Sequence, residues 1–433
     1  MTDLFFVQKV YRKIFSNFSW GPKLKSLILP IHHKFFTKAK VFSPVQHRTF
    51  RMVWYAENLH TKEFIGYSNN GLDAADEIAI DGLSTSLSAE KSELITVVDE
   101  CVLTGGSRFI SRNGMVSLDI ARSPVDLAQL YKDYYFQEEV LGIASYDPKL
   151  LTIRLNIAPS QMQLLGHWVS ILHSTSDNWM HFLAEGASKL HLATENVKDL
   201  PFGILFDENL PPSAWEVIQL LSGGRPMIGI PHGFSVKVSH LVVPVENVPT
   251  CSAVWPRNNG FCGIGFFDFD SDALISLRFK IFRHFSIIPK CTRSIYIDRK
   301  STFRHIVNQS EVEKVLLGQG FESISPGKMS LKEQVKVFSE ASVVVAQAGA
   351  ALANMMFMPS GSKVICLVGD SEWLNYGYFQ QYAEIFGLDF IYVQGCVHDP
   401  DSYDDSKVGT INHPYNSEFE LPVGELLKVL ERV

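Results

Sequence analysis

The sequence predicts an α/β protein that consists of two successive α/β domains with a cleft between them. Two blocks of alternating strands and helices indicate this class, one beginning at Leu151 and one at Ser294. The clearest unit is residues 342–368, SVVVAQAGAALANMMFMPSGSKVICLV, in which a buried strand, a break at Gly349, a helix and a second strand follow one another. A chain of 433 residues is long enough for domains of this size.

The composition is that of an ordinary globular protein, with 46% hydrophobic and 20% charged residues. The six cysteines never occur as CxxC, so we expect reduced thiols in a cytoplasmic protein and no zinc site. No apolar run reaches 18 residues and the first residues do not read as a signal peptide. We therefore expect no membrane-spanning segment.

Residues 1–51 form a basic and aromatic N-terminal segment. It contains ten lysines and arginines against the single acid Asp3, whereas the whole chain has a net charge of −7. Basic residues mixed with large apolar ones suit peripheral contact with an anionic membrane, and a helical arm packed on the protein itself is the alternative. Because the rest of the chain is acidic, we expect no nucleic acid partner.

Residues 52–280 are the predicted N-terminal domain. Its first part shows short strands near 94–98 and 116–120 and helical periodicity over 124–141. The alternation expected for parallel strands follows, with strands over 151–157, up to 172, over 202–206 and over 226–230, and with helices from 178 and over 213–221. Loops over 244–272 and a connecting helix over 272–285 lead to the second domain.

Residues 281–415 are the predicted C-terminal domain, followed by an amphipathic C-terminal helix within 416–433. Strands are expected over 294–298, 321–324, 342–346 and 363–368, and helices over 310–317, 331–341 and 350–358. The spacing of Ser330 with Glu333, and of Ser310 with Glu313, predicts capping boxes at two helix starts.

A phosphate-binding turn is predicted where the strand at 342–346 ends. The N–H groups and the positive dipole end of a helix would point out of the sheet edge at Gly349, Ala350 and Ala351, whose small side chains let a ligand approach the backbone. Asn354 would present an amide nearby. Close packing of a helix on a strand explains the same composition without a ligand.

A candidate general base lies on the helix that begins near Asn178, which is expected to line the cleft. His181 and Glu185 are four residues apart and share one helix face, while Asp177 or Ser176 is expected to cap the helix. An imidazole oriented by a carboxylate can accept a proton near neutral pH. A solvent-exposed His–Glu pair without chemistry is the alternative.

Cationic residues follow the strand at 294–298. This group suits a diphosphate, which arginine grips in bidentate fashion, and a solvated basic loop is the alternative. Its members are Arg299, Lys300, Arg304 and His305. His232 also follows a strand and is expected to line the same cleft.

Two other signals carry little weight. Asp268 and Asp270 form a DxD, a spacing that is very common by chance, so we expect no bound metal. The sequence has no GxGxxG or GxxxxGK[ST] near a strand, which argues against an NAD-type dehydrogenase and a P-loop enzyme.

Three segments resemble glycosyltransferase family 61, which includes bacterial capsular-polysaccharide glycosyltransferases. They are similar to the family's Asn-x-x-His helix start, its Tyr-Ile-x-Arg…Arg…Asn-Glu pattern and its closing Gly-Ala-x-Leu-x-Asn-x-x-Phe block, in the same order. The segments are NWMHFLAE from Asn178, YIDRKSTFRHIVNQSEVEKVL from Tyr296 and SLKEQVKVFSEASVVVAQAGAALANMMFMPSG from Ser330. Two positions depart from the pattern: Ala348 stands where the family usually has histidine, and Gln309 where it has glutamate.

The resemblance implies a GT-B-like pair of Rossmann-like domains facing a cleft, the first for the acceptor and the second for the donor. It implies an inverting transfer from a nucleotide-sugar donor to a glycan or lipid-linked glycan acceptor in surface polysaccharide biosynthesis, with no cofactor and no obligatory metal. His181 and Glu185 would be catalytic, and the donor would be bound by Arg299, Arg304, Gly349, Ala350, Ala351 and Asn354. Ala348 motivates an alternative, a catalytically inactive nucleotide-sugar or glycan-binding subunit, and a sugar-nucleotide epimerase of the same shape is a third reading.

Overall fold

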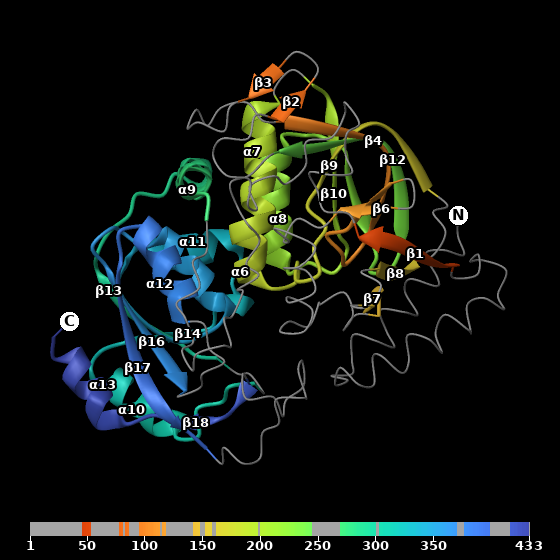
Figure 1. Cartoon of the computed structure of the whole chain (residues 1–433). Coiled ribbons are helices and arrows are strands. Elements are labelled where there is room, and N and C mark those ends of the chain that lie inside the picture. Colours follow the sequence, from red (N-terminus) through yellow and green to blue (C-terminus); the bar gives the residue numbers. More distant parts are fainter. Residues whose placement is uncertain are drawn as a thin grey trace, which may run out of the picture.

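The computed structural model of the chain describes residues 46–52, 78–80, 83–85, 95–112, 115–117, 142–147, 152–157, 162–197, 200–244, 269–299, 303–369, 376–398 and 416–432. Most of the basic N-terminal segment, the helix predicted at 124–141 and most of the loops predicted at 244–272 lie outside these residues. The described chain folds into two halves, each built on its own sheet (Figure 1). None of the described helices is long and apolar enough to cross a membrane.

The first half is built on a ten-stranded mixed sheet. Its strand order is β11 (Met227–Ile230), β10 (Phe202–Asp207), β9 (Met162–Ser170), β12 (Ser235–Pro244), β4 (Ile95–Thr104), β5 (Ile110–Arg112), β6 (Met115–Ser117), β1 (Gln46–Met52), β8 (Thr152–Ile157) and β7 (Ala144–Asp147). The first four strands of this order, β11 to β12, are parallel to one another, whereas β8 pairs antiparallel with β1 and β7. Two further strands, β2 (Ile78–Ile80) and β3 (Leu83–Thr85), form a hairpin of their own.

The prediction that parallel pairing begins at residue 151 is wrong, because the parallel block starts at β9. The short connection between Ile157 and Met162 leaves no room for the crossover helix that a parallel pair requires.

Helices follow β9 and β10 as predicted. One continuous helical run consists of α6 (Trp179–His181), a π-helical segment η1 (Phe182–Ala187) and α7 (Ser188–Asn196), and β10 leads into α8 (Pro212–Ser222). Helix α8 has proline in its first turn and ends at Gly223, whose φ of 56° is a left-handed conformation that glycine adopts at little cost.

The second half is built on a six-stranded sheet in which the first five neighbours are parallel. Its order is β14 (Glu322–Ile324), β13 (Arg293–Ile297), β15 (Ala341–Gln347), β16 (Lys363–Gly369), β17 (Asp389–Val397) and β18 (Phe419–Glu420). Numbered along the chain, the parallel strands lie in the order 2-1-3-4-5, the order of a doubly wound sheet. In such a sheet the strand order reverses between the first and third strands, here β13 and β15.

Helices connect these strands, and most of them lie at the places predicted from the sequence; the helix at 376–385 and the strand β17 were not predicted. The helices are α10 (Gln309–Gly318), the short 3₁₀ turn η3 (Pro326–Lys328), α11 (Leu331–Ser339), the 3₁₀ helix η4 (Ala350–Phe357) and α12 (Tyr376–Ile385), with α13 (Val423–Leu430) at the end of the chain. The expectation of an α-helix at 350–358 is wrong in type. Six of the eight residues of η4 are buried, so core packing decides the local geometry over helix-forming composition.

One of the two predicted capping boxes is present. Ser330 Oγ accepts the N–H of Glu333 at 3.3 Å, and Glu333 Oε2 accepts the N–H of Ser330 at 2.8 Å. The box predicted at Ser310 is wrong, because α10 starts at Gln309 and the residue in the N-cap position is Asn308.

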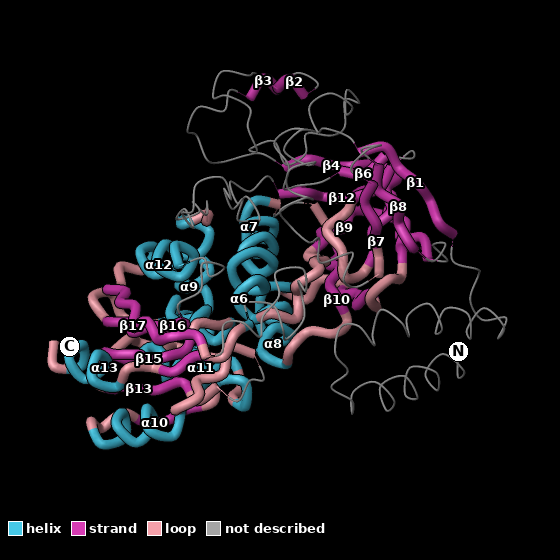
Figure 2. Tube along the Cα trace, turned by 60° about the horizontal axis from the view of Figure 1, so that its bottom comes forward, coloured by secondary structure: helices cyan, strands magenta, loops and turns pink. Residues whose placement is uncertain are grey.

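The two halves share one continuous hydrophobic core. Figures 1 and 2 show α6, α7 and α8 between the first sheet and the second half. Across this boundary Gln334 Nε2 donates to Ser213 Oγ at 2.7 Å, and the Glu216 carboxylate accepts the N–H of Leu331 at 3.2 Å. Arg278, on the connecting helix α9 (Ser271–Phe285), donates to the carbonyl oxygen of Met358 at 2.6 Å. The halves are therefore joined by a packed surface as well as by the chain.

Candidate active site

Asp207, the last residue of β10, organises the carboxyl ends of the parallel strands in the first sheet. It is fully buried; Oδ2 accepts the N–H of His173, which follows β9, at 2.8 Å, and Oδ1 accepts the N–H of Gly106 at 2.5 Å. His232, in the turn after β11, has Nε2 4.0 Å from Oδ1. Burial raises the pKa of Asp207, and His232 and the two N–H donors offset only part of that effect. One carboxylate thus fixes the loops that lead into the site.

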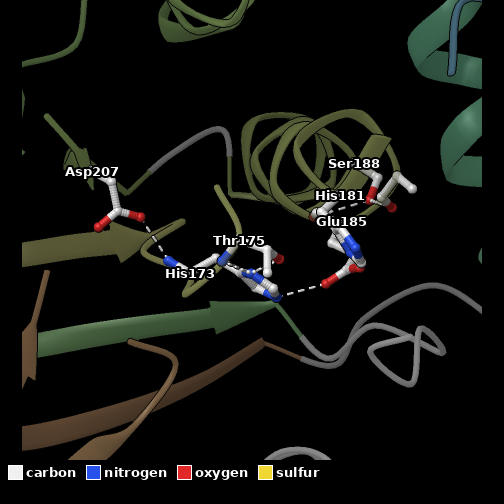
Figure 3. Close-up of polar contacts among 7 residues, drawn as sticks. His173, Thr175, His181, Glu185, Ser188 and Asp207 are labelled. Atoms are coloured by element: carbon white, nitrogen blue, oxygen red, sulfur yellow. Dashed lines mark hydrogen bonds and ion pairs between the residues drawn. The ribbon is translucent and has the colours of Figure 1, made fainter. Parts of the chain in front are cut away.

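The tautomer of His173 follows from its hydrogen bonds. The backbone N–H of Thr175 donates to His173 Nδ1 at 3.0 Å. Because an N–H can only donate, this nitrogen carries no proton, so the proton of the imidazole lies on Nε2. Nε2 lies 2.7 Å from Glu185 Oε2 (Figure 3), and the side chain is only 13% exposed.

Glu185 is buried between His173 and His181. Its Oε1 lies 2.6 Å from His181 Nδ1, so the pair predicted from the four-residue spacing is a direct contact (Figure 3). Burial alone raises the pKa of Glu185, but the two imidazoles outweigh it and hold that pKa well below its usual value. An ionised Glu185 accepts the Nδ1 proton of His181, and Nε2 is then left as a proton acceptor on a side chain that is 27% exposed.

The helix geometry around this pair is unusual. Asn178 caps the helical run, since its Oδ1 accepts the N–H of Met180 at 3.0 Å; the prediction that Asp177 or Ser176 is the cap is wrong. Asn178 holds that place because its extended backbone directly precedes the first turn. The run then passes through the π-helical segment that contains Glu185. Such segments are frequent at functional sites.

Arg299 and Gly349 meet where the strand order of the second sheet reverses. Arg299 follows β13 and Ala348 follows β15; Nη1 of Arg299 donates to the carbonyl oxygen of Ala348 at 2.6 Å. A Cβ on Gly349 would lie 2.7 Å from that nitrogen, so glycine leaves room for the guanidinium. Open α/β sheets bind ligands outside the strand ends at such a reversal, and phosphates where a helix begins there.

The other predicted donor-binding residues lie around the same sheet. Ala350 and Ala351 begin η4 directly after Gly349. Arg304 has a left-handed backbone with φ of 55°, its N–H donates to the carbonyl oxygen of Asn416 at 3.0 Å, and its charge lowers the pKa of buried Cys366 in β16, which burial raises far more. Arg304 therefore lies close to the sheet that also carries Arg299.

A hydrogen bond connects the two groups of residues. Trp179 Nε1 donates to Asn354 Oδ1 at 3.1 Å, and Asn354, which is fully buried, donates through Nδ2 to the carbonyl oxygen of Ala351 at 3.2 Å. The ring of His181 also lies 6.4 Å from the ring of Tyr378 in α12 of the second half. In this conformation the Asn354 amide bridges the halves, and its predicted hydrogen bond to a donor remains a prediction.

No group of His, Cys, Asp or Glu within the described ranges has a geometry that could hold a metal ion. Asp270, one carboxylate of the DxD, accepts the N–H of Ala273 at 2.9 Å and caps α9, whereas Asp268 lies outside the described residues.

Two residues of the site, His173 and Asp207, were not predicted from the sequence. Their mutual hydrogen bond joins positions 34 residues apart, which periodicity does not reveal. The usable signal is positional: each is a polar residue at or just beyond the carboxyl end of a predicted strand.

The fold and the site together define a class. One sheet carries a histidine–carboxylate pair, which can accept a proton, and the other carries an arginine against its strand-to-helix turn, where an anion can bind. The family model described as Glycosyltransferase 61 matches residues 179–365. The chain therefore carries a glycosyltransferase family 61 domain over these residues, which confirms the resemblance and supports glycosyltransferase activity. No curated protein matches the sequence.

Proposed function

We propose that the protein is an inverting glycosyltransferase with a nucleotide-sugar donor. His181 Nε2 accepts the proton of an acceptor hydroxyl while that oxygen forms a bond to the anomeric carbon, and the bond from this carbon to the donor diphosphate breaks on the opposite face. The leaving diphosphate keeps the electron pair, and Glu185 stabilises the imidazolium that forms. The observation that carries the proposal is the buried Glu185 carboxylate 2.6 Å from His181 Nδ1.

The diphosphate of the donor would bind at the strand reversal of the second sheet. Arg299 already lies against the turn at Ala348 and Gly349, and Ala350 and Ala351 carry the first N–H groups of η4. A guanidinium and free N–H groups are suited to the charge that develops on the departing diphosphate. Arg304 adds a second cation, and the two halves take a GT-B-like arrangement around the reacting atoms.

The acceptor would be a glycan or lipid-linked glycan in surface polysaccharide biosynthesis. The support is the family together with the basic and aromatic composition of residues 1–51, which suits a protein held at the cytoplasmic face of an anionic membrane. No cofactor and no metal is needed for the transfer, because arginine and backbone N–H groups supply the charge stabilisation.

Two measurements test this function. A thermal-shift screen against UDP, GDP, CMP and dTDP identifies the nucleotide, because a ligand that binds the native state raises the melting temperature. The corresponding nucleotide sugars are then assayed for transfer, and NMR of the product reports its anomeric configuration. Nucleotide binding followed by transfer with inversion supports the proposal, and a retained configuration contradicts the direct displacement.

A catalytically inactive binding subunit is the second candidate, and Ala348 is the observation that favours it. The Ala348 side chain is buried in the shared core, its N–H donates to the carbonyl oxygen of Leu367 at 3.0 Å and its own carbonyl oxygen accepts from Arg299. The position thus acts through its backbone, and the imidazole usual in the family is absent. Tight nucleotide binding with no transfer to a broad acceptor panel would favour this candidate.

A further inference from the structure

His173 lies six residues before the region that the family model matches, yet its imidazole touches the carboxylate of the proposed base pair. We propose that His173 is a positioning residue for the transfer: it keeps Glu185 ionised and aimed at His181 Nδ1, so that His181 Nε2 stays ready to accept a proton. This inference rests on the proposed function of His181.

The first argument is the tautomer of His173. Thr175 donates its N–H to Nδ1, and His173 Nε2 faces Glu185 Oε2 at 2.7 Å. The proton of the neutral imidazole therefore lies on Nε2, the nitrogen that faces the carboxylate. His173 therefore places the positive end of its Nε2–H bond against the carboxylate, with Nε2 2.7 Å from Oε2.

The second argument is that His173 cannot readily turn away. Asp207 accepts the backbone N–H of His173 at 2.8 Å, which holds the backbone. Thr175 donates its N–H to Nδ1, which holds the ring on the side away from Nε2. The two imidazoles lie on either side of Glu185, with ring centroids 6.0 Å apart and planes inclined by 22° (Figure 3). Oε1 is thus hydrogen-bonded to His181 Nδ1 and Oε2 faces His173 Nε2, which favours one orientation of the carboxylate.

The third argument concerns charge. Among the described residues, the titratable groups in contact with Glu185 are His173 and His181. Tyr378 lies against the His181 ring. Asp207 accepts the backbone N–H of His173, and His232 lies beside Asp207. Burial disfavours an ionised Glu185, so the carboxylate depends on its two imidazoles. If one imidazole is lost, Glu185 holds a proton more tightly, and the His181–Glu185 pair is protonated at higher pH.

A matched pair of substitutions tests the role. In His173→Gln the side-chain amide can still donate to Glu185, whereas His173→Leu removes the donor at similar volume. We expect His173→Leu to lower kcat about tenfold to a hundredfold, the range for losing a polar contact to a buried charged group, with KM unchanged. The acid limb of its pH–rate profile moves to higher pH. In His173→Gln the acid limb of the pH–rate profile stays at the wild-type pH. The same is expected for the control His284→Gln, on the exposed end of α9.

A second readout needs no substrate. NMR of histidine labelled at Cε1, with the His181 signal assigned by His181→Gln, follows the protonation of the His181–Glu185 pair. A rise of this pKa in His173→Leu and none in His173→Gln supports the positioning role even if no transfer is ever observed. An unchanged titration and an unchanged pH–rate profile in His173→Leu overturn it. If His173→Leu does not fold, His173→Asn replaces it, because the asparagine side chain is too short for its amide to reach Glu185. A titration and a pH–rate profile of His173→Asn that equal those of the wild type overturn the proposal as well.

Discussion

At the scale of single residues, two buried carboxylates of the site are shifted in opposite directions. Glu185 has an imidazole at each oxygen and a lowered pKa, whereas Asp207 is bound mainly by backbone N–H groups and has a raised pKa. The difference follows from the partners, because burial raises both pKa values and only the paired imidazoles outweigh it. Glu185 is thus suited to stabilise a positive charge on His181, and Asp207 to hold loops.

His191 gives a prediction about stability and pH. It is buried on α7 with Nε2 2.9 Å from Ser276 Oγ, and burial, followed by the charge of Lys280, lowers its pKa from 6.5 to about 4. Because the folded pKa lies below the unfolded one, the stabilisation is complete above pH 6.5 and is lost as the pH falls toward 4. We expect a loss on the order of 3 kcal/mol from this residue.

Urea unfolding of the wild type and of His191→Leu at pH 7.5 and pH 4.5 checks the prediction, since other titrating groups cancel in the difference. The wild type should lose more stability than the variant over this range. Equal losses in both proteins would mean that His191 titrates as it does in the unfolded chain.

Gly349→Ala tests the contact between the turn and Arg299. The new Cβ would lie 2.7 Å from Nη1, which must move, while the φ of 170° suits any residue. We expect nucleotide diphosphate to bind about tenfold to a hundredfold more weakly, with little change in unfolding free energy because the displaced group ends a flexible side chain. Isothermal titration calorimetry measures this. Gly327→Ala is the control, since nothing lies within 4 Å of its added Cβ; an equal loss in both variants contradicts the placement.

At the scale of elements, most strands and helices of the second half were predictable, because buried strands and capped amphipathic helices carry strong local signals. Helix α12 and strand β17 were not predicted, and neither were the type of η4 and the cap of α10. In η4 the buried side chains from Leu352 to Phe357 decide the geometry. At α10 the start of the helix is fixed by Asn308. Its side-chain amide donates through Nδ2 to the carbonyl oxygen of Leu421, near the end of the chain, and accepts the N–H of Leu421 through Oδ1.

The two serines predicted as caps offer a direct comparison. Ser330→Ala removes a hydroxyl that accepts the N–H of Glu333, and we expect it to lower the unfolding free energy by about 1 kcal/mol. Ser310→Ala removes an exposed hydroxyl without a capping role and should change it by less than about 0.5 kcal/mol. Chemical denaturation of both variants measures the difference, and equal effects would contradict the assigned helix starts.

At the scale of the whole molecule, the candidate site joins residues that are far apart in the sequence. The helix face shared by His181 and Glu185 was predictable from a spacing of four, and Arg299 and Gly349 from their positions after strands. The contacts Trp179–Asn354 and His173–Asp207 were not, since they depend on how the sheets pack and not on any local pattern. The sequence signal for His173 is only its place beyond β9.

The shared core predicts how the molecule unfolds. Because α8 and α11 bond across the boundary through Gln334 and Ser213, neither half should remain folded when the other opens. We expect scanning calorimetry to show a single main transition. Gln334→Ala leaves the Ser213 hydroxyl without this partner and should lower its midpoint without splitting it, at a cost of about 1–3 kcal/mol. Two separate transitions in the wild type would show that the halves are independent.

The central claim is that His181 supplies the chemistry and Arg299 holds the donor. Its most direct test is turnover of a nucleotide sugar, with and without acceptor, by the wild type, His181→Ala and Arg299→Ala, together with nucleotide affinity. Removing a general base costs about a hundredfold or more, so His181→Ala should lose turnover while still binding nucleotide, and Arg299→Ala should lose nucleotide affinity. Unchanged turnover in both variants would contradict the account.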